Sequence, residues 1–382
     1  MRRTWIPLLV LALVVVGAAA FWPRLRSPRF AQPQNPAPSA PSKPAPAAPA
    51  PSGEKGKATL TSVKVSTAPV LDGKVDQVWN QATPMDIPVS GGFAGDITVS
   101  MRSVYTNDSA YFLLQWPDQE LSERRAPWVY NGNGKFSKAP VAPAGFNPED
   151  MANWTKRPDG YAYEDKAAII WNINNSTKNF NSTGCFIACH PDATPRPLKY
   201  TNADGELLDM WHWKLVRTDP YARLDDQYVD NTSDVKVNKG AGRKGDPGGP
   251  DYDPNEKPDK SGPAFVSKDK LTAPPYAIRN ENKREITDAD ITALKQGDEI
   301  PSIIIGTTAI ATKTDRSDVN GKGFYDAQKK MWTLEIGRMM TTGSKYDVQF
   351  DPKNPYFFGV AIFNNAQIEH SYNTGAYRLV FR

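Results

Sequence analysis

Two cysteines and a histidine lie close together in the middle of the chain. The segment reads Gly184-Cys185-Phe186-Ile187-Ala188-Cys189-His190 and holds both cysteines and one of the three histidines. Two thiols can add to the vinyl groups of a porphyrin, and the adjacent imidazole can bind the iron. The usual motif has two residues between the cysteines, whereas this chain has three. The pattern predicts one covalent haem c attached through Cys185 and Cys189, with His190 as the proximal ligand.

Other chemistry remains open for these three residues. Cys185 and Cys189 could form a small disulfide in an oxidising compartment. A zinc ion would need four ligands, and the segment offers three. An unattached catalytic thiol is a further alternative.

The amino terminus has the pattern of an export signal. Arg2 and Arg3 precede an apolar run from residue 5 to residue 22 that contains no charged residue. This run is close to the length of about 20 residues that a membrane-spanning helix needs. We therefore expect residues 1–26 to be a signal sequence or, preferably, an uncleaved membrane anchor.

A tether is predicted to follow this leader. Residues 27–57 are dominated by Pro, Ala and Ser, which cannot form a core and favour an extended, semi-rigid chain. The expected location of the folded body is therefore periplasmic or otherwise extracytoplasmic, tethered to the cytoplasmic membrane. Haem c attachment and disulfide formation both fit such a compartment.

Composition limits the possible functions. The chain has 382 residues with 46 basic and 42 acidic side chains, and its formal net charge is +4. These charges are spread along the chain, without the basic stripe and interleaved aromatics typical of nucleic-acid binding. We find no Walker loop, dinucleotide fingerprint or nucleophile elbow.

Strand patterns dominate residues 58–382. Alternating or β-branched runs predict strands at 59–65, 97–105, 110–116, 166–173, 300–310, 330–338, 356–363 and 377–381. Helical patterns are short: one turn at 75–82, and a helix at 288–295 with Thr287 as its N-cap. The predicted fold is a mainly β, antiparallel β-sandwich with long loops and a few short helices.

Two segments interrupt the strand pattern. Residues 124–157 read as an aromatic loop that includes Trp128, Tyr130 and Trp154. Residues 235–284 are rich in Gly, Pro, Asp and Lys, so we expect a polar, exposed excursion or a partner-docking arm.

Several motifs together resemble a known family. An opening signature runs from Ala68 to Ala82 and contains Asp72-Gly73 and Trp79; the next strand pair matches at 104–113. Further matches are the segments 209–217 and 224–227, and the closing segments 332–335, 359–363 and 370–371. In this pattern the chain resembles the c-type haem branch of the ethylbenzene-dehydrogenase γ-type haem-binding domains, which share their opening signature with certain sugar-binding modules.

The resemblance implies a β-sandwich with one haem pocket and an electron-transfer role. In the family a ligand comes from a segment just after the penultimate strand, and His370 falls at the matching place. The resemblance therefore implies His370 as the distal iron ligand, in a six-coordinate centre suited to electron transfer. His212 and Met210 are the alternatives; Met331, Met339 and Met340 are also available, and an open or water-bound position is possible.

Residues near His212 have expected roles of their own. Lys214 and Arg217 could pair with haem propionates, or lie at a solvated strand edge. Trp211 and Trp213 are expected to pack on the porphyrin or in the core.

The acidic pair Asp225-Asp226 has two possible roles. Paired carboxylates can bind calcium. The alternative, which we favour from the sequence, is solvation at the surface.

The leading functional prediction is an exported mono-haem cytochrome c that carries electrons between redox protein partners and is not itself an enzyme. One alternative is the haem subunit of a molybdenum-containing oxidoreductase, in which the partner is a catalytic subunit. Another is a haem-free sugar-binding module, in which Trp128, Tyr130 and Trp154 would stack on sugar rings. An enzyme with an open haem position is the last.

Overall fold

The computed structural model describes residues 58–141, 160–188, 199–249, 252–307 and 314–382. The predicted leader and tether lie outside the described residues, as do Cys189, His190 and Trp154. The chain divides into a unit of residues 1–46 and a unit of residues 47–382, and the fold below is that of the second. Among the described residues, no helix has the length and apolar character needed to cross a membrane.

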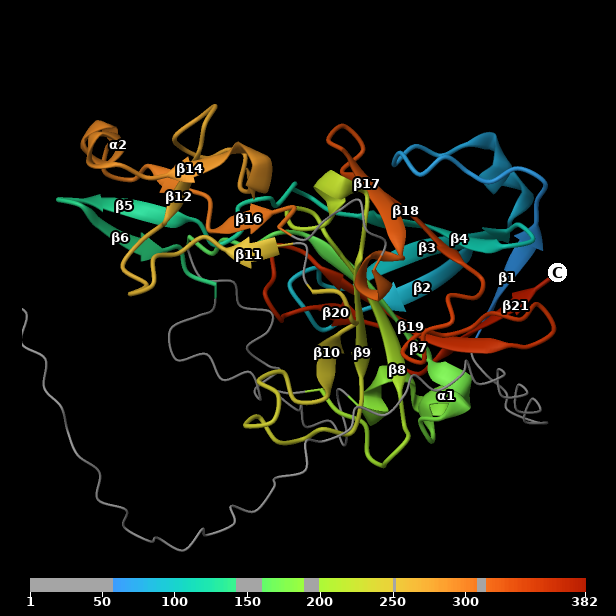
Figure 1. Cartoon of the computed structure of the whole chain (residues 1–382). Helices are drawn as coiled ribbons and strands as arrows, with labels where there is room; N and C mark the ends of the chain where they lie inside the picture. Colours follow the sequence, from blue (N-terminus) through green and yellow to red (C-terminus); the bar gives the residue numbers. More distant parts are fainter. Residues whose placement is uncertain (1–57, 142–159, 189–198, 250–251, 308–313) are drawn as a thin grey trace, which may run out of the picture. The chain divides into compact units, whose positions relative to one another are not determined.

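One large sheet forms most of the fold (Figure 1). Its strand order is β10-β9-β8-β7-β19-β21-β1-β3-β4-β18-β17, with β2 paired to β3 and β20 paired to β19. Nearly all neighbours are antiparallel; β1 instead runs parallel to both β21 and β3. The bounds are β1 Thr59–Lys64, β2 Met85–Val89, β3 Ile97–Tyr105, β4 Ser109–Pro117, β7 Lys166–Asn172, β8 Leu208–Lys214, β9 Asp225–Val229, β10 Arg243–Gly245, β17 Asn320–Asp326, β18 Met331–Met339, β19 Tyr356–Phe363, β20 Ser371–Tyr372 and β21 Tyr377–Phe381.

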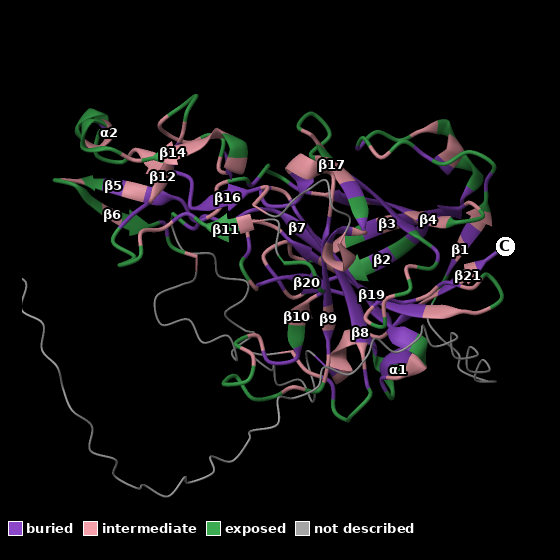
Figure 2. Ribbon diagram, viewed as in Figure 1, coloured by how far each residue is buried: buried purple, intermediate pink, exposed green. Residues whose placement is uncertain are grey.

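The two halves of this sheet pack against each other through an aromatic core. Phe112 of β4 lies 5.5 Å from Trp171 of β7, measured between ring centroids, and 5.7 Å from Trp211 of β8. Trp116 of β4 contacts Trp213 of β8 in the same layer. Strands β7 and β8 are buried along their whole length, as Figure 2 shows in purple. The predicted mainly β fold, an antiparallel β-sandwich, is confirmed.

Three small sheets lie outside the main sheet. They are β15-β5-β6, β11-β16-β13 and β12-β14. The bounds are β5 Trp128–Gly132, β6 Lys135–Lys138, β11 Tyr252–Pro254, β12 Phe265–Ser267, β13 Ile278–Arg279, β14 Lys283–Glu285, β15 Glu299–Ile300 and β16 Ile303–Ile305. Residues 124–157, expected as a loop, supply β5 and β6, and the other strands lie between residues 252 and 305. In place of a wholly exposed arm, residues 235–284 supply β10 to the main sheet and bury Val266 and Ile278. The polar composition did not predict these strands, because strands this short need only a few apolar side chains to be buried.

The described helices are short. They are α1 Phe180–Thr183 and α2 Asp288–Ala293, with 3-10 turns η1 Gln77–Gln81, η3 Ile173–Asn175, η4 Gly184–Ile187, η6 Asp219–Tyr221, η7 Asn280–Asn282 and η8 Asp315–Ser317. Both predicted helical segments are confirmed. Thr287 caps α2 in a capping box with Asp290, because each side chain accepts a hydrogen bond from the other residue's backbone amide.

The opening signature of the sequence has a structural explanation. Glu335 of β18 is fully buried and accepts hydrogen bonds from the backbone amides of Asp72 (3.0 Å) and Gly73 (2.8 Å) and from Trp79 Nε1 (2.8 Å). Gly73 has φ +82°, and a Cβ there would lie 2.7 Å from Cβ of Phe324. The signature thus ties the first loop to the sandwich through one buried carboxylate, and its residues stabilise the fold.

Replacing Trp79 by Phe is expected to destabilise the protein by about 1–3 kcal/mol more than Trp116→Phe. Both indoles are buried, but Trp116 Nε1 has no hydrogen-bond partner among the described residues. The two changes therefore remove similar volume, and only Trp79→Phe leaves Oε1 of Glu335 without its donor. Urea unfolding of both variants measures the difference; equal losses would contradict this role for Trp79.

Glu335 also predicts a pH dependence of stability. Burial raises its pKa above the usual value of 4.5. The folded state therefore holds the Glu335 proton more tightly than the unfolded state, and stability is lost as pH rises through the folded pKa. Relative to Glu335→Gln, the wild-type free energy of unfolding should fall as pH rises above about 4.5, until Glu335 is ionised in the folded state. The exposed Glu285→Gln variant is the control and should follow the wild-type curve. If the difference between wild type and Glu335→Gln does not change with pH, the effect is refuted.

Candidate functional site

A cavity that is partly open to solvent lies on the face of β7, β8 and β19 that points away from the aromatic core. The strands form the floor, and nearby loops form the walls. The lining residues are Ala168, Ile170, Cys185, Lys199, Met210, His212, Arg243, Gly359, Val360, Ala361, Phe363, Gln367, Ile368 and His370.

Strand register explains how the floor is built. Side chains alternate between the two faces of a strand, so residues that pair across an antiparallel sheet share a face. One row across β19, β7 and β8 is Ala361, Ala168 and His212, and the next is Gly359, Ile170 and Met210. Small residues in these rows leave space above the sheet, into which His212 and Met210 can project.

His212 carries the clearest sign that this cavity holds a ligand. The residue is 4% exposed, and both imidazole nitrogens are buried without a hydrogen-bond partner among the described residues. Burial, and then the positive charges of Lys214 and Lys166, lower its pKa well below the usual value. The ring is therefore neutral and has a lone pair to offer. An unpartnered buried nitrogen costs about 1–3 kcal/mol, so a ligand that contacts this ring would remove a real penalty.

His370 reaches the same cavity from the loop between β19 and β20. Its Nδ1 donates a hydrogen bond of 2.6 Å to the carbonyl of Ile368. Because that carbonyl can only accept, the proton sits on Nδ1 and the lone pair on Nε2. A backbone partner of this kind fixes ring orientation and tautomer in many metal-binding histidines.

Phe363 lies between the two histidines. Its ring centroid is 5.3 Å from that of His212 and 4.7 Å from that of His370. Lys166 Nζ lies 4.0 Å from the centroid of the same ring. Phe363 therefore sets the separation of the two imidazoles, a role that the sequence motifs do not reveal.

Cys185 also lines the cavity, and two glycines fix the segments around it. Gly184 precedes Cys185 with φ +66°, and a Cβ there would lie 2.3 Å from the carbonyl oxygen of Gly375. A Cβ on Gly92 would lie 2.1 Å from the carbonyl carbon of His370. Side chains at either glycine would push the Cys185 turn or the His370 loop away. Cys189 and His190 lie outside the described residues.

The methionine alternatives separate clearly. Met210 is buried and lines the cavity. Met340 packs in the aromatic core, and Met339 is 47% exposed. Met331 and Met339 are the first and last residues of β18, and Met340 follows them, so all three lie in the other half of the sheet. The structure thus brings together Cys185, His212, His370 and Met210, and leaves the other three methionines away from the cavity.

Lys214 and Arg217 are buried ion-pair partners, and the expected solvated strand edge is wrong for both. Lys214 Nζ contacts Asp225 and lies 2.9 Å from the hydroxyl of Tyr252. Burial lowers the pKa of Lys214 to about 7. Arg217 is bonded to Glu164 through its side chain. Each cation already has an acidic partner inside the fold, which weakens their case as propionate partners.

Two other cations line the cavity instead. They are Lys199 and Arg243, and the Arg243 side chain makes no ion pair or hydrogen bond among the described residues. Arg243 lies in β10 within the polar segment, where the sequence offered no sign of a cavity. Its position suits recognition of an anionic group at the cavity mouth.

Trp211 and Trp213 point to the opposite face of β8 from His212 and pack in the core. Their rings lie among Phe112, Trp116 and Trp332. They therefore support the floor from behind and do not line the cavity.

The acidic pair is buried, so the expected surface solvation is wrong. Asp225 and Asp226 are 3% and 0% exposed. Asp225 pairs with Lys214 and with Arg316, which lies 2.6 Å away. Asp226 shares the core face with Trp211, its partner in the β8–β9 register.

Trp128 and Tyr130, the two described residues among those suggested for sugar stacking, do not form an exposed platform. Trp128 and Tyr130 are 4% and 8% exposed in β5. Trp128 Nε1 donates a hydrogen bond of 2.6 Å to the carbonyl of Asn255. Their faces are therefore occupied by neighbouring residues of the small sheets.

Comparison with solved structures returns carbohydrate-binding folds at low similarity. A family 9 carbohydrate-binding module from Caldicellulosiruptor kristjanssonii in complex with glucose has 9% identity and a TM-score of 0.30, covering 85% of this chain and 96% of that one. A candidate carbohydrate-binding protein from Bacteroides uniformis has 8% identity and a TM-score of 0.33, covering 85% and 99%. No curated protein sequence matches the chain.

The family comparison covers most of the chain. A family model described as ethylbenzene dehydrogenase matches residues 76–375. This range spans η1 through the β20–β21 turn and so includes every described residue that lines the cavity. The chain belongs to the ethylbenzene dehydrogenase family.

Proposed function

We propose that this protein is an exported mono-haem cytochrome c that carries electrons between redox partners. The observation that supports it most is the cavity in which Cys185, His370 and the unpartnered nitrogens of His212 come together. A haem would supply a one-electron couple there. The chain's own residues would hold it, exclude water from it and set the polarity around it.

The residues at the cavity have distinct proposed roles. Cys185 and Cys189 would hold the porphyrin covalently, and His190 would be the proximal ligand. His370 would be the distal ligand, because its Nδ1 bond to Ile368 directs the lone pair to Nε2. Two histidine ligands leave no position for a substrate, so the protein itself would not be an enzyme.

His212 would then satisfy its nitrogens on another part of the same group. No backbone carbonyl among the described residues accepts from it, which leaves a propionate or the iron as the partner. Arg243 and Lys199 would compensate propionate charge at the wall. His212 and Met210 remain the competing iron ligands.

A second candidate is the haem subunit of a molybdenum-containing oxidoreductase, which membership of the ethylbenzene dehydrogenase family favours. The partner would then be a catalytic subunit, and protein purified from its native membrane would carry molybdenum in a fixed ratio to haem. A free electron carrier would purify without it. In both cases residues 1–26 would tether the protein to the cytoplasmic membrane from its periplasmic side.

Covalent attachment is tested with protein matured in a host that assembles c-type cytochromes. Wild type should retain its haem after denaturation and acid–acetone extraction, and give a pyridine haemochrome spectrum of the thioether type. The double variant Cys185→Ser/Cys189→Ser should lose all covalent haem. Colourless wild-type protein, or a Cys185–Cys189 disulfide found by mass spectrometry, would refute the proposal.

The distal ligand is tested by electron paramagnetic resonance of the oxidised protein. His370→Ala should lose the native low-spin signal, whereas His212→Ala and the matched cavity variant Met210→Leu should keep it. Loss of the signal in His212→Ala alone would assign the ligand to His212 instead. Carbon monoxide binding to reduced wild type without loss of a ligand would favour an open site and contradict the six-coordinate proposal.

A further inference from the structure

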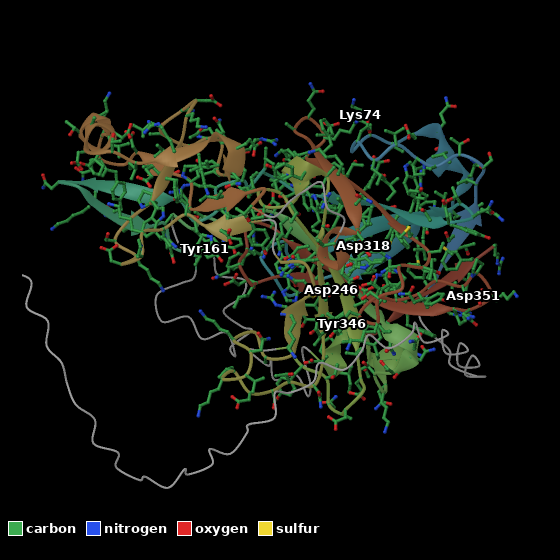
Figure 3. All side chains as sticks on the ribbon, viewed as in Figure 1. Lys74, Tyr161, Asp246, Asp318, Tyr346 and Asp351 are labelled. Atoms are coloured by element: carbon green, nitrogen blue, oxygen red, sulfur yellow. The ribbon has the colours of Figure 1, made fainter. Side chains whose placement is uncertain are left out.

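A cluster of buried and half-buried aspartates lies on the core side of β8 and β9, behind the floor of the cavity. Its members come from separate segments of the chain: Asp209, Asp226, Asp246, Asp315, Asp318 and Asp347. The carboxylate oxygens of Asp226, Asp246 and Asp347 lie within 4.8 Å of one another. Asp315, Asp318 and Asp347 form a second such group, so Asp347 is common to both. Figure 3 labels Asp246 and Asp318 in this region.

The fold brings these residues together by strand register and local hydrogen bonds. Asp226 faces the core from β9, and the amide of Asp246, just after β10, donates to the carbonyl of Asp226 at 3.2 Å. Asp209 of β8 accepts hydrogen bonds from the amide of Val348 at 2.9 Å and from Arg338 at 3.1 Å. Because Val348 directly follows Asp347, this hydrogen bond holds Asp347 beside Asp209.

The positive charge in the cluster is small. Arg338 is buried and pairs with Asp209, and its Nη1 lies 3.7 Å from Asp347. Asp226 and Asp246 make no ion pair among the described residues. Deprotonated carboxylates packed this way need an additional cation.

Unpartnered oxygens point to where that cation would sit. Asp226 Oδ2, both carboxylate oxygens of Asp246 and Asp347 Oδ1 are buried and receive no hydrogen bond within the described part of the chain. These three residues are 0%, 2% and 0% exposed. Buried polar atoms in native proteins almost always have a partner, so four orphaned oxygens at one place need an explanation.

We propose that Asp226, Asp246 and Asp347 bind one calcium ion, a structural site independent of the proposed haem. The donors are all carboxylate oxygens, which calcium prefers and zinc does not. Calcium–oxygen distances of about 2.3–2.6 Å place opposite ligands about 4.6–5.2 Å apart, which accommodates the observed spacing. Magnesium usually keeps several waters and is seldom held by a closed group of protein carboxylates.

Such an ion would join β9, the turn after β10 and the segment after β18. Asp226 and its neighbour Asp225 face opposite sides of β9, and Asp225 pairs with His212 in the β8–β9 register. Calcium would thus stiffen the strands behind the cavity without touching any residue that lines it.

The test is calcium binding and thermal unfolding of the purified protein after treatment with EDTA. Titration calorimetry should show one calcium per chain, and saturating calcium, about 100 times Kd, should raise Tm by roughly 5 °C. Magnesium at the same concentration should do much less. An absence of binding heat, or an equal Tm shift with magnesium, would overturn the proposal.

Asp226→Asn and Asp246→Asn should lose the calcium response, whereas the exposed Asp86→Asn on β2 should retain it. In EDTA, Asp246→Asn should be at least as stable as wild type, because the amide can be buried without taking up a cation or a proton. A variant that loses the calcium response but remains as stable as wild type in EDTA has lost the site and has not misfolded. A full calcium response in Asp226→Asn/Asp246→Asn would overturn the assignment, and haem content measured in parallel reports separately on the proposed electron carrier.

Discussion

The alternation of side chains along β8 is the constraint on which the rest of this structure depends. Asp209, Trp211 and Trp213 face the core, whereas Met210 and His212 face the cavity. Because the alternation has a period of two, a slip of one residue would exchange every member of these sets. The aromatic contacts to β4 prevent such a slip, since they fix which face of β8 is inside. The core thereby positions the candidate site.

Buried charge is the second theme of the fold. Around the cavity, Lys214 and Arg217 are neutralised by Asp225 and Glu164 inside the protein. On the core side of β8 and β9 the balance is reversed: within the described part of the chain, several carboxylates surround one paired cation, Arg338. Ion pairs taken out of water are stable only when each charge is compensated. The two sides of one strand pair thus have opposite electrostatic requirements.

The sequence predicted the positions of the strands better than the contacts that their residues make. Runs such as 97–105 and 356–363 are read correctly because they alternate or are β-branched, and Thr287 marks a helix start. Strands β8 and β9 are harder, since they are buried on both faces and carry Asp, His and Lys. Arg243, Phe363 and Gly92 could not be predicted at the cavity, because only tertiary packing brings β10, the end of β19 and a distant loop to one place. The burial of Asp225 and Asp226 was missed for the same reason: their counter-charges come from other strands.

The contact between Gly184 and Gly375 has a consequence for the order of assembly. The turn that carries Cys185 rests on residues near the carboxyl terminus, and β19, one of the three strands of the cavity floor, is also made late. A chain that leaves the ribosome from its amino end therefore presents the Cys185 thiol long before the residues that enclose it are made. An enzyme that modifies Cys185 can act on an open, accessible segment before the sandwich closes over it.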